Sequence, residues 1–424
     1  MKKNDRLAVS ASDRWQWFND ARFGLFIHYG LYSLLERGEW VMFNERMRPA
    51  DYAKLVDRFK PRPDCAKLWA KAAVSAGAKY AVFTTRHHDG FCLFDTKTHG
   101  FSTPQTRCGR DLVREYVDAA REAGLRVGLY YSLIDWREPG YFEPGKYAAS
   151  AANLVDTVHA QVRELMTNYG QIDQLWYDGD WVSHGRVDVD KAAFWRGKAL
   201  NAMVRRLQPS ILINNRCGLS ADIDTPEQHV TESAPGRAWE SCMTIGDSAG
   251  WGYVRHSPNM KTTTQLLQNL CTAASGEGNY LLNFGPKPDG SIRREETVRL
   301  DAMGAWLKTN GRSIYGSQRC DLPDQRLPGA PLGVWTRQGN TAFLHVFRWP
   351  GEELTLALVD TKVKRVELLG TPGRLSARRE PTGRLIISGL PRLPPDPHIN
   401  TLAFTFDGEP RRFVERDMAA WLDA

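Results

Sequence analysis

Short apolar runs alternate with helix-like segments from about residue 20 to residue 320, and this alternation constrains the fold more than any other feature of the chain. The runs are apolar throughout, which is typical of strands buried on both faces. Strands that alternate with helices imply a parallel α/β arrangement. The clearest strand candidates are Gly24–Gly30, Lys79–Thr85, Arg126–Ser132, Asp173–Asp178, Ser210–Asn215 and Asn279–Phe284.

The number of these units favours one α/β class over another. Six or more strand–helix units in about 300 residues fit a (β/α)8-like TIM barrel better than an open doubly wound sheet. After residue 320, Pro and Gly punctuate short β-like pieces at intervals of roughly ten residues, a pattern typical of an antiparallel β-sandwich. We therefore predict a catalytic barrel over residues 1–325 and a C-terminal β-sandwich domain over residues 326–424.

Composition excludes several other classes of protein. The net charge is +7, from 56 basic and 49 acidic residues, but the cations are spread along the chain, so we expect no nucleic-acid partner. No stretch of 18 apolar residues occurs, and no apolar segment follows the N-terminal lysines, so we expect no membrane association and a cytoplasmic location. The seven cysteines include no CxxC, which argues against a disulfide framework or a zinc site. A homo-oligomer is left open.

Polar residues follow the predicted strands at the end where barrel enzymes carry their active sites. His28 ends the first run, His87 and His88 the second, and Asp178 the fourth, while Arg216 follows the fifth. Neighbouring strand residues point to opposite faces, so His87 and His88 are better suited to binding a polar ligand than to sharing one metal ion. No GxGxxG follows a strand, and we expect neither a metal nor a cofactor.

Carboxylates near these strand ends indicate the chemistry. Asp178 ends an apolar strand, where a carboxylate is costly unless it is paired, caps a helix or is functional. Glu227 follows a proline and Glu240 follows a tryptophan, and either can supply a second carboxylate. A Glu packed against an aromatic ring has a raised pKa and can act as an acid. Two carboxylates in an aromatic, His-rich cup are the apparatus of glycoside hydrolysis.

Eight segments in order resemble the α-L-fucosidases of glycoside hydrolase family 29. They are WFNDARFGLFIHYGLYS (17–33), GEW with NERM (38–47), KYAVFTTRHHDGFCLFDTK (79–97), GLRVGLYYSLIDW (124–136), LWYDG (175–179), TPEQ (225–228), WESCMTIGDSAGWGY (239–253) and GNYLLNFGPKPDG (278–290). The resemblance implies the same barrel with a C-terminal β-sandwich and a retaining exo-α-L-fucosidase acting on a fucosylated oligosaccharide or glycoconjugate.

The resemblance also implies roles for individual residues. Asp178 of LWYDG is the expected nucleophile, and Glu227 of TPEQ is the expected acid/base, with Glu240 of WESC as the runner-up. Retention requires the two carboxyl groups to lie about 5–5.5 Å apart. Trp176 is expected near the methyl group of fucose and Arg216 near the nucleophile. The other expected fucose-binding residues are His28, Glu39, Trp40, His87, His88 and Tyr131.

TPEQ together with WESCMT and WGY resembles the subgroup that acts on branched α-1,3/1,4-linked fucose. Other hypotheses stay open beside this one. An α-L-galactosidase would bind a sugar that differs from fucose by one hydroxyl, which an apolar pocket rejects weakly. A non-catalytic sugar-binding protein would lack a carboxylate of the pair. A metal-dependent hydrolase using His87 and His88 would lose activity with a chelator.

Overall fold

Eight parallel strands form one sheet in the computed structural model, which describes residues 13–413 except 235, 247–249, 258, 324–325, 328–329 and 382. The strand order is β5-β4-β3-β2-β1-β8-β7-β6, and every pairing is parallel. The strands are β1 (Phe23–Ile27), β2 (Tyr80–Arg86), β3 (Arg126–Ser132), β4 (Gln174–Asp178), β5 (Leu212–Ile213), β6 (Ile223–Asp224), β7 (Ala238–Thr244) and β8 (Asn279–Phe284).

The sheet closes on itself between its two end strands. Asn214, directly after β5, forms a parallel bridge with Ile223 of β6. The N–H of Asn215 donates to the carbonyl of Ile223 at 3.0 Å, and the N–H of Asp222 donates to the carbonyl of Ile213 at 2.8 Å. The ring of strands is therefore a TIM barrel, and the predicted fold class is confirmed.

Apolar and aromatic side chains fill the barrel, and every strand contributes to one cluster. A strand that is buried on both faces does not alternate apolar and polar residues as a half-exposed strand does. Strand β2 is an example, because all seven of its residues are buried. The cluster members on the strands are Phe26, Tyr80, Val82, Tyr130, Trp176, Leu212, Ile223, Cys242 and Leu281. This packed interior forms the floor beneath the carboxyl ends of the strands.

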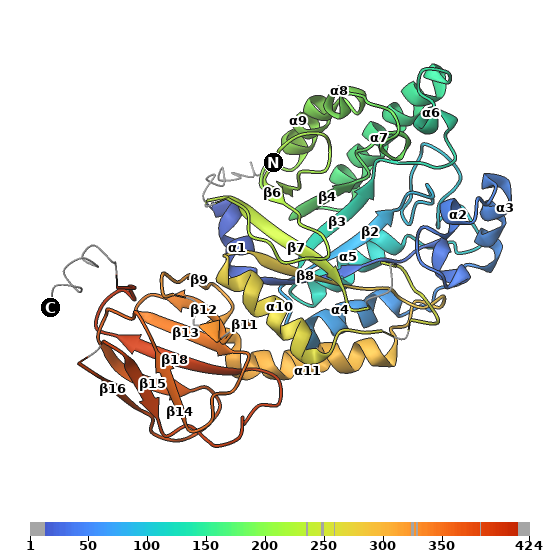
Figure 1. Ribbon diagram of the computed structural model, residues 1–424. Helices are drawn as coiled ribbons and strands as arrows, with labels where there is room; N and C mark the ends of the chain where they lie inside the picture. Colours follow the sequence, from blue (N-terminus) through green and yellow to red (C-terminus); the bar gives the residue numbers. More distant parts are fainter. Residues whose placement is uncertain are drawn as a thin grey trace, which may run out of the picture. The chain divides into compact units, whose positions relative to one another are not determined.

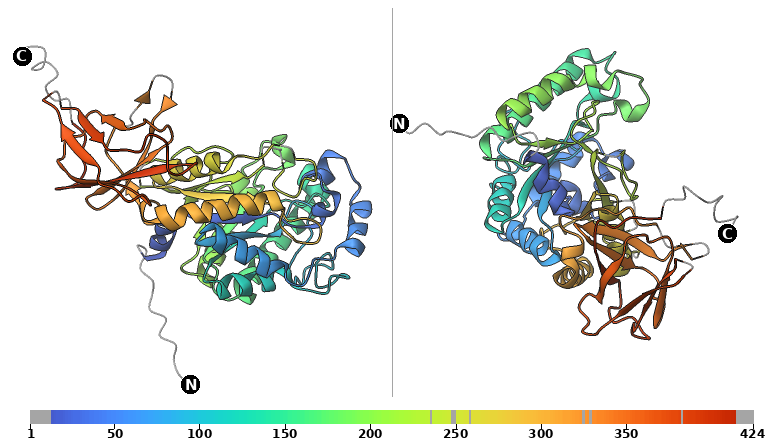
Figure 2. Two further views of the ribbon diagram at one scale, coloured as in Figure 1. Left: turned by 90° about the horizontal axis from the view of Figure 1, so that it is seen from below. Right: turned by 90° about the vertical axis from the view of Figure 1, so that its left-hand side faces the viewer.

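Helices surround the strands on the outside (Figures 1 and 2). Local signals fix their ends: the Asp111 side chain accepts from the N–H of Arg114 at 2.8 Å and caps α5. The helical segments of this part are α1 (Asp13–Ala21), η1 (Leu31–Leu35), α2 (Val41–Asn44), α3 (Pro49–Ala53), η2 (Lys54–Arg58), α4 (Cys65–Ala76), α5 (Leu112–Glu122), α6 (Pro139–Phe142), α7 (Ala148–Asn168), η3 (Ser183–Gly185), α8 (Lys191–Phe194) and α9 (Gly197–Leu207).

The chain divides into two compact units, Met1–Lys261 with Asn279–Gly304, and Thr262–Gly278 with Ala305–Ala424. Helix α10 (Thr263–Ser275) therefore groups with the C-terminal unit, although it lies between β7 and β8 in sequence, and α11 (Arg294–Asn310) spans the change of unit. The predicted domain boundary at residue 325 lies outside the described residues. Among the helices that are described, none is long and apolar enough to cross a membrane.

The C-terminal unit holds two antiparallel sheets, ordered β15-β18-β13-β12-β9 and β14-β17-β16. Side chains of both sheets share one apolar core, as in a β-sandwich. The remaining elements are η4 (Gly311–Ser313), β9 (Gln318–Arg319), the paired β10 (Arg326–Leu327) and β11 (Ala330–Pro331), β12 (Gly333–Gln338), β13 (Thr341–Val346), β14 (Glu353–Leu356), β15 (Val363–Leu368), β16 (Ser376–Arg379), β17 (Leu385–Ser388) and β18 (Asn400–Phe406).

Candidate active site

The carboxyl ends of the barrel strands surround a pocket. His28 follows β1, His87 and His88 follow β2, Asp178 ends β4, and Arg216 follows β5. Because the strands are parallel, these side chains reach the same end of the barrel. The pocket is lined by Phe26, His28, Trp40, His87, His88, Tyr130, Trp176, Asp178, Trp181, Arg216, Glu227 and Trp251.

Three side chains surround the carboxylate of Asp178. Tyr130 on β3 donates its hydroxyl to Oδ2 at 2.8 Å, and Arg216 donates from Nη1 to Oδ1 at 3.0 Å. Nε2 of His88 lies 3.7 Å from Oδ2. The side chain of Asp178 is 13% exposed, so its charge is largely removed from water but is paired and hydrogen-bonded.

One guanidinium joins the two carboxylates that the sequence predicts as the catalytic pair. Arg216 donates from Nη1 to Asp178 and from Nη2 to Oε2 of Glu227 at 2.8 Å. Its Nε donates to Oγ1 of Thr225 at 2.9 Å, and its Cζ lies 4.6 Å from the ring centroid of Trp176. The side chain of Glu227 is 39% exposed, so solvent reaches this carboxylate more readily than it reaches Asp178.

Glu240 lies in the barrel interior and does not line the pocket. Its Oε2 accepts from the hydroxyl of Tyr80 at 2.7 Å, and its Oε1 accepts from Nε1 of Trp176 at 2.9 Å and from the amide of Gln174. Burial raises the pKa of Glu240 to about 7, although the hydrogen bonds that it accepts act in the opposite direction. Glu240 thus has the raised pKa expected for a Glu among aromatic rings. Its carboxyl group does not reach the pocket, where a leaving group would lie.

The three pocket histidines are buried, and burial lowers the pKa of each one. For His28 the pKa falls to about 4, so its ring is neutral at physiological pH. The ring of His87 stacks on Tyr130 with 5.5 Å between centroids, and Nδ1 of His88 lies 2.6 Å from Oγ of Ser132. In the part of the chain that the structure describes, no group of three or more His, Cys, Asp or Glu side chains is arranged to hold a metal ion.

A buried ion pair locks the turn that carries the two adjacent histidines. Arg86, which is fully buried, donates to Oδ2 of Asp135 at 2.8 Å and to the carbonyl of Ser132 at 2.7 Å. Gly90 closes the turn at φ 75°, and a Cβ at this position would lie 2.4 Å from Oδ2 of Asp135. The RHHDG sequence thus combines an anchoring cation with a glycine that leaves room for its counter-ion.

Glu39 contacts the pocket wall rather than the pocket itself. Its Oε2 accepts from the N–H groups of Trp251 and Gly252, both at 2.7 Å. Burial raises the pKa of Glu39 to about 7, against the lowering effect of these backbone donors. The next residue, Trp40, does line the pocket. Glu39 thus holds the loop that carries Trp251, and its expected contact with the sugar stays a prediction.

Tyr131 requires a correction, because the structure directs this side chain away from the pocket. Its hydroxyl donates to Oε1 of Gln161 on α7 at 2.7 Å and accepts from Arg86 at 3.2 Å. Adjacent strand residues face opposite sides, and Tyr130 occupies the interior position instead. The sequence offers two adjacent tyrosines, and both are buried in β3, so burial does not distinguish them.

Sequence reasoning also missed three further lining residues, Phe26, Trp181 and Trp251. A usable signal existed for two of them. Trp181 follows Asp178 by three positions and Trp251 lies in the WGY segment, so both are aromatic residues next to predicted site motifs. Phe26 had no such signal, because an aromatic residue inside an apolar strand is more often part of the core.

A parallel (β/α)8 barrel with two arginine-linked carboxylates in an aromatic pocket at its carboxyl end has the site of a glycoside hydrolase. A family model described as alpha-L-fucosidase matches residues 3–312 of the chain. Tissue alpha-L-fucosidase of Rattus norvegicus is 30% identical over 90% of this chain and 86% of its own, and the Homo sapiens counterpart is 29% identical over 89% and 85%. The chain belongs to the α-L-fucosidase family and is a glycoside hydrolase.

Solved structures agree in fold with this family. Alpha-L-fucosidase isoenzyme 1 from Paenibacillus thiaminolyticus superposes with a TM-score of 0.84 at 35% identity, covering 93% of this chain and 99% of that one. An alpha-L-fucosidase from Bacteroides thetaiotaomicron gives 0.83 at 27% identity, with 93% and 96% covered. That structure is a covalent intermediate formed with 2-fluoro-fucosyl fluoride and trapped in a variant with glutamine in place of a glutamate.

Proposed function

We propose that this chain removes terminal α-L-fucose from oligosaccharides with retention of configuration, using Asp178 as the nucleophile and Glu227 as the acid/base. The observation that carries the proposal is the double contact of Arg216, which hydrogen-bonds both carboxylates at the wall of one pocket. A trapped covalent intermediate of the Bacteroides relative supports the covalent route.

The reaction takes two steps in this proposal. The carboxylate of Asp178 attacks the anomeric carbon while the bond to the leaving oxygen breaks, and protonated Glu227 gives its proton to that oxygen. A water molecule then attacks the anomeric carbon of the fucosyl-enzyme, Glu227 accepts a proton from the water, and the carboxylate of Asp178 is released. Tyr130 and Arg216, which donate to the two oxygens of Asp178, hold the free carboxylate in position between turnovers.

Access to solvent supports Glu227 over Glu240 as the acid/base. Glu227 lines the pocket and is partly exposed, so a leaving group and a water molecule can both reach it. Glu240 is fully buried and accepts hydrogen bonds on both oxygens from Tyr80, Gln174 and Trp176. A general acid must come within hydrogen-bonding distance of the atom that it protonates.

Neutral histidines and tryptophan faces account for sugar binding in the proposed complex. His28, His87 and His88 offer ring nitrogens to hydroxyl groups, while Trp40 and Trp176 offer apolar faces to the C–H side of the sugar and to its methyl group. A pocket that ends on the packed barrel core suits one terminal sugar, which agrees with exo-action.

The proposed linkage is α-1,3 or α-1,4 in a branched sugar, supported by the TPEQ segment that carries Glu227. The test compares fucose release from an aryl α-L-fucoside and from a branched oligosaccharide with α-1,3- or α-1,4-fucose, each with and without a chelator. We expect release mainly from the branched sugar and no effect of the chelator.

Each other outcome of that comparison has a definite meaning. Release from the aryl fucoside alone would remove the linkage proposal and keep the fucosidase. Release from neither substrate, with turnover of an α-L-galactoside, would overturn the substrate assignment. Loss of activity with the chelator would favour the metal-dependent alternative. The cytoplasmic location stays a prediction, and a homo-oligomer stays open.

A further inference from the structure

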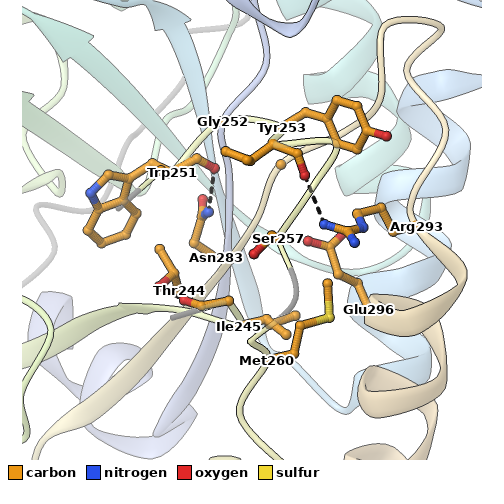
Figure 3. Close-up of a pocket in the computed structure, with 14 residues that line it drawn as sticks. Thr244, Ile245, Trp251, Gly252, Tyr253, Ser257, Met260, Asn283, Arg293 and Glu296 are labelled. Carbon is orange, nitrogen blue, oxygen red and sulfur yellow. Dashed lines mark hydrogen bonds between the residues drawn. The ribbon is translucent and has the colours of Figure 1, made fainter. Parts of the chain in front are cut away.

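Asn283 does not line the sugar pocket itself, but its side chain contacts His28, which does. Asn283 belongs to β8 and is 2% exposed. Its Nδ2 donates to the backbone carbonyl of Trp251 at 2.7 Å, a contact visible in Figure 3, where Asn283 also lines a second pocket beyond the Trp251 loop. Its Oδ1 lies 2.7 Å from Nδ1 of His28.

These two contacts determine which ring nitrogen of His28 carries a proton. A backbone carbonyl can only accept, so the amide NH2 of Asn283 must face Trp251 and the amide oxygen must face His28. An amide oxygen also only accepts. Nδ1 of His28 must therefore be the donor and carry the hydrogen.

The second ring nitrogen follows from the charge of the ring. Burial lowers the pKa of His28 to about 4, so the ring is neutral near pH 7 and holds a single N–H, on Nδ1. Nε2 is then an unprotonated acceptor. His28 lines the sugar pocket, and across the described ranges of the chain Nε2 makes no hydrogen bond.

We propose that Asn283 is a positioning residue that fixes His28 as the Nδ1–H tautomer, so that Nε2 accepts a hydrogen bond from a hydroxyl group of the bound sugar. The inference rests on the proposed function for the identity of that sugar. It adds a rule of selection at this position of the pocket: the ligand must present a donor, which a hydroxyl supplies and a fluorine or an ether oxygen does not.

Other charged and titratable groups surround the same ring. The charge of Asp178 on β4 favours the protonated form of His28. His87 and His88 after β2 would disfavour that form if they were charged. Tyr130 on β3 packs against the His28 ring with 5.4 Å between ring centroids. Both neighbouring histidines are neutral because burial lowers their pKa. Desolvation is the largest influence on His28.

The first test reads the tautomer directly, without substrate, in the full chain labelled with 15N-histidine. A His28→Gln variant identifies the His28 signals by their disappearance. We expect the spectrum of a neutral ring with a protonated Nδ1 and an unprotonated Nε2 from pH 6 to pH 8. An Nε2–H pattern for His28 would overturn the proposal. This measurement does not depend on whether any Asn283 variant folds.

The second test replaces the amide while keeping its shape. In Asn283→Asp, a carboxylate beside Nδ1 should raise the pKa of His28, so its 15N signals should titrate at least one pH unit higher than in the native chain. Asn279→Asp is the matched control: Asn279 lies on the same strand, is equally buried, and donates to the carbonyl of Phe18 at 2.9 Å. A general effect of a buried charge would shift His28 in both variants and contradict the specific link.

The third test asks whether Nε2 selects a donor. Aryl α-L-fucosides in which one ring hydroxyl is replaced by fluorine are compared in the native chain and in His28→Ala. At one ring position the fluorine should lower kcat/KM about tenfold more in the native chain than in the variant. Equal losses at every position would contradict the acceptor role. If the native chain releases fucose from no aryl or branched substrate, the proposed function fails, while the tautomer measurement keeps its meaning.

Discussion

The indole Nε1–H of Trp176 donates to the buried carboxylate of Glu240 at 2.9 Å. The guanidinium of Arg216 lies over the face of the same indole ring, with its Cζ 4.6 Å from the ring centroid. Arg216 in turn holds Asp178 and Glu227. Glu240 therefore supports the proposed catalytic pair indirectly, through two intervening residues, Trp176 and Arg216.

We predict that Glu240→Gln changes the pH dependence of stability. The folded-state pKa of about 7 lies above the ordinary 4.5, so the folded protein binds the proton more tightly than the unfolded chain does. The contribution is complete below pH 4.5, is lost as the pH rises to about 7, and is constant above that. Relative to the native chain, the variant should gain on the order of 3 kcal/mol in unfolding free energy between pH 4.5 and 7.5.

Denaturant unfolding at several pH values checks this prediction. Glutamine fits the site, since its oxygen can accept from Trp176 and Gln174 while its NH2 donates to the hydroxyl of Tyr80. Buried histidines titrate in the same range with the opposite sign, but they are common to both proteins and cancel in the difference. A difference independent of pH would show that Glu240 is ionised in the folded protein throughout.

We predict that Asp178→Ala abolishes turnover, by roughly a thousandfold or more in kcat for an aryl fucoside. Asp173→Asn is the matched control just before the same strand. Asp173 accepts from the N–H of Val127 at 2.8 Å and from Arg126 at 3.0 Å, so its replacement should cost about 1–2 kcal/mol of stability and leave kcat unchanged. Substantial turnover by Asp178→Ala would remove the nucleophile assignment.

We predict that Glu227→Ala slows natural oligosaccharides far more than aryl fucosides with good leaving groups, because such leaving groups need no proton. Added azide should restore part of the activity and give a fucosyl azide of retained configuration, since the covalent step still occurs. Azide with Asp178→Ala should instead give the inverted product, since it takes the place of the nucleophile.

Glu240→Ala is the comparison that separates the two glutamates. We expect it to lower stability and to reduce activity equally for good and poor leaving groups, because it loosens Trp176 without removing a proton donor from the pocket. Rescue of Glu240→Ala by azide, with no rescue of Glu227→Ala, would reverse the acid/base assignment.

We predict opposite effects for two adjacent tyrosines. Tyr130→Phe removes the donor to Oδ2 of Asp178 and should lower kcat/KM about tenfold with little loss of stability. Tyr131→Phe removes a contact with Gln161 and should change kcat/KM less than twofold while lowering the unfolding free energy by about 1 kcal/mol. Kinetics and denaturant unfolding of both variants decide the matter, and a kinetic defect confined to Tyr131→Phe would contradict the pocket described above.

The barrel could be predicted because most of its strands are continuous apolar runs. Strands β3 and β8 have the predicted bounds, Arg126–Ser132 and Asn279–Phe284. Strand β7 escaped prediction because Glu240 and Ser241 interrupt its apolar character, and burial of these polar groups is compensated by partners distant in sequence. The two-residue β6 is too short to leave any periodic signal.

The sequence could predict which strand ends form the site, but not which side chains at those ends point into the pocket. The motifs placed Asp178, Arg216 and Glu227 near one another, and the structure joins them through hydrogen bonds. Which of Tyr130 and Tyr131 faces inward depends on the register of β3 in the barrel, which no local pattern encodes. The burial of Glu240 depends in the same way on Tyr80, 160 residues earlier.

The closure of the barrel between β5 and β6 has a consequence for how such an enzyme can diversify. Each of these strands is two residues long, and one parallel bridge, Asn214 to Ile223, joins them. Arg216 and Glu227 follow this seam directly, whereas Asp178 ends a five-residue strand paired on both sides. Insertions and substitutions after this seam can therefore change the part of the site that receives the leaving group. The strand that carries the nucleophile need not change with them.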